Sequence, residues 1–195
     1  MSRSYFNKMA ERWDNSAAER DANKLQKIAD RLRINQGGKI LDVGSGTGVF
    51  LPYLAKKTGT FKSITAIDIA EEMLYESRKK FPGKDVIYIQ ADVGYCPFPE
   101  NYFDAVICYS SFPHFKDKEA CLSEMYRVLQ YKGTFSICHS SNRLVINSLH
   151  EGITEVCEDV LLGEQHLLQM IEEAGFKDIV IEDGEDYYFA SAQKI

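Results

Sequence analysis

Residues Ile40 to Phe50 read ILDVGSGTGVF, and this stretch decides the fold. Its first half, an apolar segment interrupted by Asp42, is typical of a buried strand. Gly44, Gly46 and Gly48 then follow within five positions. Glycine lets a backbone turn sharply and leaves no side chain in the way of a ligand. The stretch therefore predicts a strand that ends in a bare turn, which some group must approach closely.

The composition indicates an ordinary globular domain. The chain has 195 residues, of which 45% are hydrophobic, and a net charge of −6. An acidic balance argues against a general binder of nucleic acid or anionic membranes, because phosphate contacts need a positive surface. The five cysteines are widely spaced and form no CxxC pair. With neither a signal peptide nor a bilayer-length apolar run, we expect a cytoplasmic protein with reduced thiols.

Strands and helices alternate after residue 38. The apolar patterns predict strands at 39–43, 63–68, 85–92, 103–110 and 133–140. They predict helices in the N-terminal part and at 48–57, 70–81, 116–130, 143–151 and 164–174. The chain closes with a predicted hairpin of 176–183 and 186–193. Apolar strands separated by helices indicate a doubly wound α/β fold with a parallel sheet covered on both faces.

Ligands of such sheets bind beyond the carboxyl ends of the strands, where the strand order reverses. The glycine turn lies at such an end. A helix that begins near Thr47 would point free N–H groups at the same space. A nucleoside triphosphate is disfavoured, because Val49 and Phe50 follow Gly48 where the phosphate-loop pattern needs Lys and Ser or Thr. A dinucleotide is disfavoured because its third glycine would fall at Val49.

The stretch LDVGSGTG is similar to motif I of the class I S-adenosylmethionine-dependent methyltransferases. Two further carboxylates stand at the expected places, with Asp68 ending the second strand and Asp92 ending the third. The resemblance covers about residues 5–193. It implies a Rossmann-like, seven-stranded, mostly parallel sheet with a C-terminal β-hairpin, and an enzyme that converts S-adenosylmethionine to S-adenosylhomocysteine.

The resemblance also implies roles for single residues. Asp68 would accept the ribose hydroxyls and Asp92 the adenine amino group, with Asp42 supporting the glycine loop. A competing interpretation makes Asp68 and Asp92 helix caps or turn residues. The positions that the resemblance assigns to the cofactor are Asp42, Gly44, Gly46, Gly48, Asp68, Ile69, Asp92, Val93 and Tyr109.

We expect one methyltransferase domain in three parts, a helical cap at 1–36, a cofactor-binding core at 37–139 and a substrate side at 140–195. We expect a small-molecule acceptor. No large substrate domain is inserted, so the pocket would be built from the N-terminal helices, the loop 110–117 and the region 140–163. DNA is a poor candidate, because residues 110–115 read SSFPHF where amino-methylating DNA enzymes carry Asn/Asp-Pro-Pro-aromatic. We expect no membrane partner, and the oligomeric state stays open. Phe6 and Trp13 would cover the pocket, pack on the sheet, or do both.

The histidines raise two alternatives for the chemistry. His114 and His139 follow the fourth and fifth strands, so both are candidate catalytic residues at the mouth of the site. Alternatively, His114, His139 and His150 bind a divalent metal, with Glu158 and Asp159 as further candidate ligands. Surface or loop-lining histidines are the third interpretation.

A predicted helix face carries the substrate candidates Arg143, Asn147 and His150 at i, i+4 and i+7. The pattern FPHF…CHSSNRLVINSLH resembles a branch of small bacterial and archaeal methyltransferases. That resemblance names no acceptor. A methyltransferase acting on protein or RNA, and a non-catalytic protein that binds S-adenosylmethionine, stay as alternatives. Cys108 and Cys138, inside apolar strands, are expected to be buried and unreactive.

Overall fold

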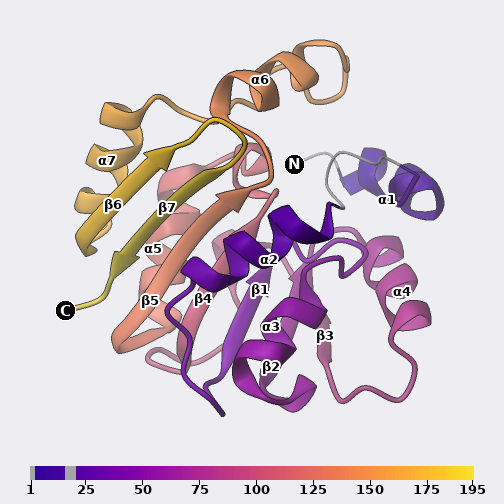
Figure 1. The fold of residues 1–195 in the computed structure, drawn as a ribbon, viewed down its shortest axis with the longest axis horizontal. Coiled ribbons are helices and arrows are strands. Elements are labelled where there is room, and N and C mark those ends of the chain that lie inside the picture. Colours follow the sequence, from indigo (N-terminus) through magenta and orange to yellow (C-terminus); the bar gives the residue numbers. More distant parts are fainter. Residues whose placement is uncertain (1–2, 16–20) are drawn as a thin grey trace.

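One seven-stranded sheet forms the centre of the protein. The computed structural model describes residues 3–15 and 21–195, and Figure 1 shows their arrangement. The strands lie in the order β3-β2-β1-β4-β5-β7-β6, and β7 runs antiparallel to both of its neighbours. Their bounds are β1 Ile40–Val43, β2 Ile64–Asp68, β3 Ile87–Gln90, β4 Phe103–Tyr109, β5 Leu129–His139, β6 Lys177–Asp183 and β7 Tyr188–Gln193. The predicted fold class, with its terminal hairpin, is confirmed.

The α-helices connect and cover these strands. Their bounds are α1 Arg3–Trp13, α2 Ala22–Arg31, α3 Leu51–Thr58, α4 Glu71–Lys80, α5 Lys118–Val128, α6 Arg143–Glu151 and α7 Glu164–Glu173. Short 3₁₀ turns lie at Phe61–Ser63, Val93–Tyr95 and Phe112–His114. Across the described part of the chain, every helix is too short or too polar to cross a bilayer.

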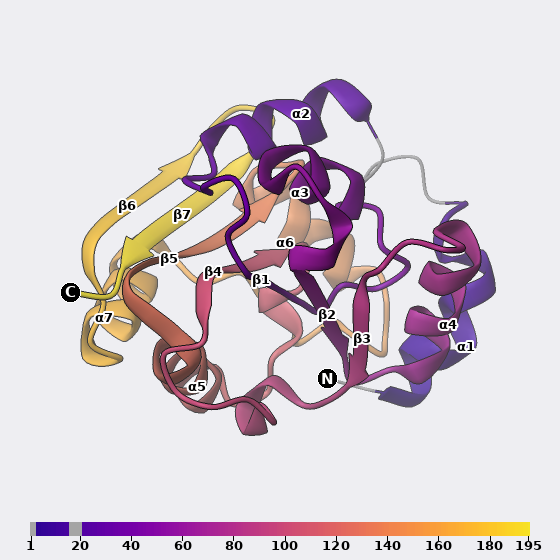
Figure 2. The same cartoon turned by 90° about the horizontal axis from the view of Figure 1, so that it is seen from below.

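Figure 2 shows from below that α2 and α3 lie on one side of the sheet and α5 and α7 on the other. Alternate residues of a strand face opposite sides of a sheet. Leu41 and Val43 of β1 join the core that contains α5 and α7, whereas Ile40 joins the core that contains α2 and α3. All four residues of β1 are buried. Burial on both faces explains why β1 and β2 read as continuous apolar runs instead of alternating patterns.

The strand order reverses at β1, which lies between β2 on one side and β4 on the other. The chain leaves β1 toward α3 on one face, while the loop after β4 leads to α5 on the other. The loops after these three strands therefore meet at one edge of the sheet, the usual position of a ligand in this architecture.

Two predicted boundaries are wrong. Helix α3 begins at Leu51 instead of near Thr47, because Gly48 has φ +79°, outside the range of a right-handed helix. Pro52 lies in the first turn of α3, where a missing N–H is tolerated. Strand β5 begins at Leu129, inside the predicted helix 116–130, because Leu129 has extended backbone and pairs with Phe103.

The two helices of the predicted cap pack in different places, because α1 packs on α4, whereas α2 packs with α3 in the sheet core. Phe6 and Ala10 of α1 form a small apolar cluster with Ala70, Met73 and Val156. Arg3 binds Glu71 at the start of α4 with two hydrogen bonds of 2.8 Å. Helix α1 thus lies beside the sheet edge where the loops meet. Residues 1, 2 and 16–20 of the predicted cap lie outside the described residues.

Candidate active site

The glycine turn is tied to the neighbouring strand β2. The Ser45 N–H donates to the Ile67 carbonyl at 3.0 Å, and the Gly46 N–H donates to Asp68 Oδ2 at 2.9 Å. The Gly48 N–H then closes a tight turn onto the Ser45 carbonyl at 3.0 Å. Backbone hydrogen bonds of this kind hold the turn in one shape without any help from a side chain of the turn itself.

The three glycines serve different purposes. A Cβ at Gly44 would overlap the side chain of Ser111, and a Cβ at Gly48 would overlap Ser77 and approach Leu51 Cδ1 to 2.9 Å. These two glycines are therefore required by packing inside the protein. No described atom lies within 4 Å of a Cβ built on Gly46, which has φ +55°. Gly46 is thus the member of the triplet whose missing side chain leaves open space.

Asp68 holds the junction between β2 and α4. Its Oδ1 accepts a hydrogen bond of 2.8 Å from the Ala70 N–H, while its Oδ2 accepts the Gly46 N–H. Only 6% of the residue is exposed. Burial raises the pKa of Asp68 to about 6, against the lowering effect of these hydrogen bonds. Asp68 therefore fits the predicted turn role, and each oxygen keeps a second lone pair for a ligand.

Asp42 is a buried carboxylate with an unsatisfied atom. Its Oδ2 and the Ser45 hydroxyl find no hydrogen-bond partner among the described residues. Burial raises the pKa of Asp42 to about 7, the nearby Ser45 hydroxyl opposes this shift, and repulsion from Asp68 adds to it. A buried acceptor without a donor costs free energy. This cost is understandable if Asp42 and Ser45 face a ligand, since both line a cavity.

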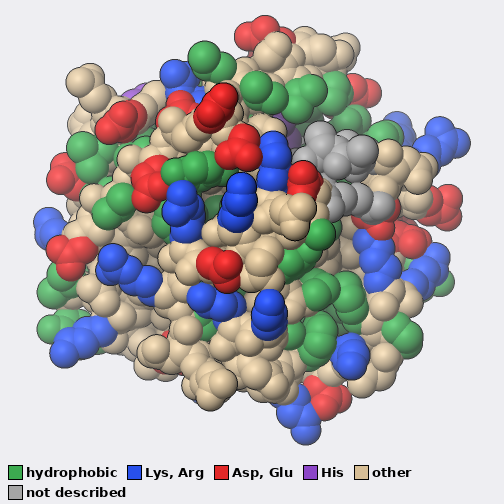
Figure 3. All heavy atoms as spheres, viewed as in Figure 1, with side chains coloured by type: hydrophobic (Ala, Val, Ile, Leu, Met, Phe, Trp, Pro, Cys, Tyr) green, Lys and Arg blue, Asp and Glu red, His purple; other side chains and the backbone are tan. Residues whose placement is uncertain are grey.

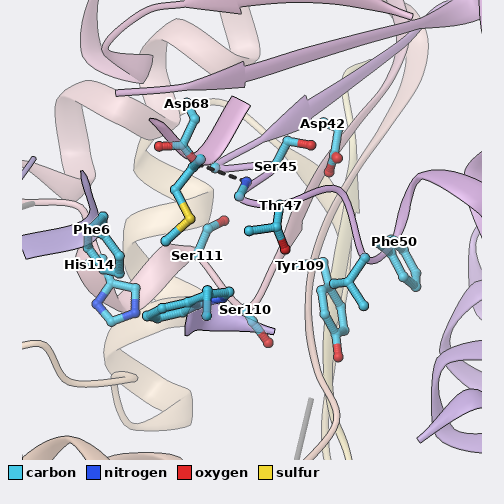
Figure 4. A pocket seen from close by; sticks show the side chains of 15 residues that line it. Phe6, Asp42, Ser45, Thr47, Phe50, Asp68, Tyr109, Ser110, Ser111 and His114 are labelled. Carbon is cyan, nitrogen blue, oxygen red and sulfur yellow. Dashed lines mark hydrogen bonds between the residues drawn. The ribbon is translucent and has the colours of Figure 1, made fainter. Parts of the chain in front are cut away.

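Two cavities meet at this turn. The larger, of about 250 Å³, is lined by residues that follow β1, β2 and β3, among them Ile69, Asp92 and Val93. The smaller, of about 50 Å³, lies between the glycine turn, the end of β4 and α1. Gly44 and Asp68 line both cavities. Figure 4 shows the smaller one, with Asp68 on one side of the turn and Tyr109 on the other.

Asp92 caps the short turn that follows β3. Its Oδ1 accepts a hydrogen bond of 2.9 Å from the Gly94 N–H. The residue is exposed, so its side chain also reaches the larger cavity, as does its buried neighbour Val93. Asp92 therefore acts as a turn residue, as the competing interpretation predicted, and it also lines a cavity that a ligand could occupy.

The end of β4 carries an aromatic wall and a strained residue. The Tyr109 ring stacks on Phe50 with centroids 4.6 Å apart and planes 11° apart. Ser110 follows with φ +50°, a left-handed conformation that costs free energy for a residue with a Cβ. Ser110 lines the smaller cavity and also a third cavity of about 40 Å³ beside β5 and α6. The strain at Ser110, which sequence patterns did not signal, lies where the two spaces adjoin.

The structure brings His114, His139 and His150 together. The rings of His114 and His150 are 4.8 Å apart, and His114 Nδ1 lies 2.8 Å from Asp159 Oδ2. His139, 3% exposed, has an Nε2 with no hydrogen-bond partner among the described residues. Burial, then the neighbouring His114 and His150, lower the pKa of His139 to about 3. Burial also lowers the pKa of His114, although Asp159 opposes this shift.

These histidines are not arranged as a metal centre. In residues 3–15 and 21–195, no group of three or more His, Cys, Asp or Glu side chains is placed to hold a metal ion. Asp159 bonds to a histidine ring directly, instead of sharing a metal with it. His150 uses its Nδ1 on the Asp159 carbonyl. Among the predicted ligands, Asp159 thus contacts His114 with its carboxylate and His150 with its backbone carbonyl, whereas His139 Nε2 contacts none of them.

The predicted substrate face of α6 is largely engaged within the protein. Asn147 donates from Nδ2 to the Leu161 carbonyl at 3.1 Å and accepts the Leu161 N–H at Oδ1 at 2.8 Å. The Arg143 guanidinium lies 3.6 Å from Asp183. Asn147 and His150 thus fasten the segment 152–163 to α6. Helix α6 exposes Leu144, Val145 and Leu149, and hydrophobic side chains are visible over this helix in Figure 3.

Helix α1 closes the smaller cavity from outside. Phe6 and Trp13 line it, and the Phe6 ring meets the His114 ring edge to face at 5.1 Å. Asp14 accepts a 2.6 Å hydrogen bond from the Thr47 hydroxyl and forms an ion pair with Lys80. The residue that follows α1, Asp14, is therefore bonded to Thr47 of the glycine turn.

The cysteines are thiols. Cys108 and Cys138 are completely buried in the sheet, and burial raises the pKa of both well above the usual value. They pack as small apolar residues, as predicted.

Comparison with known proteins agrees with this architecture. The family model described as a methyltransferase domain matches residues 41–137, about half of the chain. A ubiquinone/menaquinone biosynthesis C-methyltransferase of Wigglesworthia glossinidia brevipalpis is 37% identical over 114 residues, which cover 56% of this chain and 46% of that protein. The enzyme of the same name from Pasteurella multocida is 27% identical over 187 residues, covering 82% and 67% respectively. The matched region thus spans about half the length of the first of these relatives.

Solved structures show the same fold. A Haloferax volcanii complex between the Trm112 methyltransferase activator and a methyltransferase gives a TM-score of 0.80 at 20% identity, covering 96% of both chains. A SAM-dependent methyltransferase from Aquifex aeolicus gives a TM-score of 0.74 at 22% identity, with both chains fully covered. At this level of identity the similarity concerns the fold.

Proposed function

We propose that this chain, which belongs to the class I S-adenosylmethionine-dependent methyltransferases, transfers the methyl group of that cofactor to a small-molecule acceptor. The observation that carries the proposal is the pair of cavities that meet at Gly44 and Asp68. They lie where the strand order reverses, and their walls carry a carboxylate at the end of β2 and a bare glycine at the turn. Family membership supports the reaction, and the geometry supports the location.

The residues present suit the cofactor. Asp68 would accept from the ribose hydroxyls, and Ile69, Asp92 and Val93 would surround the adenine in the larger cavity. The open space at Gly46 would admit the methionine part, whose ammonium group could satisfy the unpaired oxygen of Asp42. The bound cofactor supplies an activated methyl group on a sulfonium. The protein then mainly aligns the acceptor and excludes water.

The acceptor side would lie beyond Ser110. The third cavity is lined by Ser110, His139, Ser140, Ser141, Ile146, Leu149 and His150, a set that carries no carboxylate, Lys or Arg side chain. His139 stays neutral at physiological pH because its pKa is low, so its unpaired Nε2 can accept or donate one hydrogen bond. These features favour an uncharged reacting end with one polar group and an apolar flank. His114, next to this space, would take the proton of an acceptor that must lose one.

The closed mouth favours a small molecule over protein or RNA. Helix α1 is fastened across the smaller cavity through Asp14 and Glu71, and the segment 152–163 lies against His114. A polymer chain would need an open groove, and RNA a positive one. The net charge of −6 is unfavourable for RNA. The relatives named for ubiquinone/menaquinone biosynthesis make a hydroxylated aromatic ring the first acceptor class to test.

The cofactor role of Asp68 is tested by calorimetry with S-adenosylhomocysteine. Asp68→Ala should weaken binding at least tenfold, because a buried, charged pair of hydrogen-bond acceptors is lost. Asp85→Ala is the matched control, since Asp85 is an exposed carboxylate before β3 that pairs with Lys62. Equal affinities of the wild type and the Asp68 variant, with both folded, would remove the ribose role.

The acceptor is sought by incubating the protein with S-adenosylmethionine and fractions of a metabolite extract, then measuring S-adenosylhomocysteine. Quinols and simple phenols are included as defined compounds. Turnover that needs one fraction would identify the acceptor. Tight cofactor binding without turnover in any fraction would favour the non-catalytic alternative.

A further inference from the structure

The loop that follows α6 places a carboxylate against a buried histidine of the site. Segment 152–163 returns from α6 and brings Asp159 Oδ2 to 2.8 Å from His114 Nδ1. His114 is 7% exposed and lines the smaller cavity beside Asp42, Gly44 and Ser110. His114 Nε2 forms no hydrogen bond with the described residues. One ring nitrogen is thus committed to the protein and the other is left to the cavity side.

Segment 152–163 is held firmly enough to orient the ring. Its far end is fixed by the two hydrogen bonds between Asn147 and the Leu161 backbone. Its centre is fixed by the Asp159 carbonyl on His150 Nδ1 and by Val156, which packs with Phe6 of α1. The His114 ring is bounded further by Phe6 at 5.1 Å and His150 at 4.8 Å.

The charges around the pair favour an ionised Asp159. Burial opposes the shift, but the hydrogen bond to His114 lowers the pKa of Asp159 below its usual value, and the positive charge of Lys118 adds a smaller lowering effect. Lys118 is held nearby, because its Nζ donates to the Pro113 and Phe115 carbonyls, both at 2.9 Å. An ionised carboxylate has no proton to give. The hydrogen bond at 2.8 Å must therefore be donated by His114 Nδ1–H, which leaves Nε2 as the basic nitrogen.

We propose that Asp159 is a positioning residue of the methyl-transfer site, which holds His114 as the Nδ1–H tautomer with a basic Nε2 directed to the acceptor. The inference rests on the proposed function, since it assigns a purpose to His114 within it. His114 receives the acceptor's proton at Nε2 as the methyl group is transferred. The imidazolium ring then carries a positive charge, which the Asp159 carboxylate balances. Fixing tautomer and orientation in this way is how a buried carboxylate assists a histidine base.

The test is nitrogen-15 NMR of the protein's histidines at pH 8, without any acceptor. The chain contains four histidines, and the His114 signals are assigned by their loss in His114→Gln. In the wild type we expect the Nδ1–H tautomer to exceed nine-tenths of the His114 population. In Asp159→Asn the amide N–H can donate to Nδ1, so at least half of the population should shift to the Nε2–H tautomer. Glu158→Gln, which changes the exposed neighbouring carboxylate, should leave the pattern unchanged.

An Nε2–H tautomer of His114 in the wild type would overturn the proposal. This measurement uses the wild type alone, so it remains valid even if Asp159→Asn does not fold. An unchanged tautomer in a folded Asp159→Asn would overturn it as well. The affinity for S-adenosylhomocysteine is measured on the same samples, and Asp159→Asn should keep it within about twofold. A wild type that does not bind S-adenosylhomocysteine would contradict the proposed function. The tautomer measurement tests only the role of Asp159.

Discussion

At the scale of single residues, the site is defined by polar groups that the fold leaves unsatisfied. Asp42 Oδ2, Ser45 Oγ and His139 Nε2 are buried without partners among the described residues. Each such atom costs free energy in the folded state. Asp42 and Ser45 line the cavity at the glycine turn, whereas His139 lines the cavity beside α6. We interpret the two groups as facing different parts of the bound reactants.

The raised pKa of Asp42 predicts that cofactor affinity depends on pH. The pKa is about 7 in the free protein, because the carboxylate is buried and lies near Asp68. A cationic cofactor stabilises the ionised form, so binding should release a proton when the pH is below 7. We expect S-adenosylmethionine to bind about tenfold more weakly at pH 6 than at pH 8. Calorimetry at both pH values, in buffers of different ionisation enthalpy, measures the affinity and the proton release.

Asp42→Asn serves as the control for this effect, because its side chain has no proton to release. Its affinity should be lower than that of the wild type at pH 8 and should change by no more than about twofold between pH 6 and pH 8, since only Asp68, with a pKa of about 6, still titrates there. A pH-independent affinity in the wild type would show that another group faces the cofactor's charge.

At the scale of elements, the turn between β1 and α3 contains one glycine that stability requires, Gly48, and one that we expect ligand binding to require, Gly46. Gly48→Ala should lower the free energy of unfolding by about 2–4 kcal/mol, from strain at φ +79° and overlap with Ser77 and Leu51. Gly46→Ala meets open space, so only the strain at φ +55° remains, about 1 kcal/mol. Its added methyl group should instead weaken cofactor binding. Urea unfolding and calorimetry on both variants measure the two effects.

The opposite result would be informative as well. If Gly46→Ala kept full affinity, the open space at this position would not belong to the cofactor. The assignment of the methionine part to the smaller cavity would then be wrong, while the packing role of Gly48 would be unaffected.

The sequence predicted the elements well and their ends less well. Alternation of apolar segments was sufficient for the central strands, because burial on both faces leaves a continuous apolar run. The start of α3 was misplaced because a left-handed φ at Gly48 depends on contacts with α4, far away in the sequence. The start of β5 was misplaced because pairing of Leu129 with Phe103 overrides a local helical pattern.

For the site residues too, local spacing was predictable and tertiary contacts were not. Carboxylates that follow strands, such as Asp68 and Asp92, were predictable from order and spacing. The contact between His114 and Asp159 was not, because 45 residues separate them and only the path of segment 152–163 brings them together. Helical spacing placed Asn147 on the substrate face, but its amide binds Leu161, a tertiary contact that spacing cannot reveal. The strain at Ser110 likewise depends on the complete sheet.

At the scale of the whole molecule, the smaller cavity is closed by α1, a helix that packs on α4 in an apolar cluster of its own. Helix α1 is held at one end by Arg3 and Asn7 on Glu71, and beyond its other end by Asp14 on Thr47 and Lys80. The anchors at Glu71 are exposed to solvent, so they can exchange with water at little cost. Phe6, which stands between Arg3 and Asn7 in the sequence, adds apolar contacts with Met73 and Val156 beside the anchors at Glu71. We therefore expect α1 to open while the sheet stays intact.

This arrangement predicts that the anchors control how long the cofactor stays bound. Glu71→Gln weakens the bonds to Arg3 and Asn7, and combining it with Thr47→Val removes the hydrogen bond to Asp14. We expect the double variant to release S-adenosylhomocysteine at least fivefold faster, with a much smaller change in the association rate, because most affinity differences arise in dissociation. Stopped-flow fluorescence of Trp13, the single tryptophan, reports the cap directly.

Glu76→Gln, which disrupts only an exposed pair with Lys79 on α4, is the matched control and should match the wild type. Equal dissociation rates in the double variant and the control would mean that these polar anchors do not limit release.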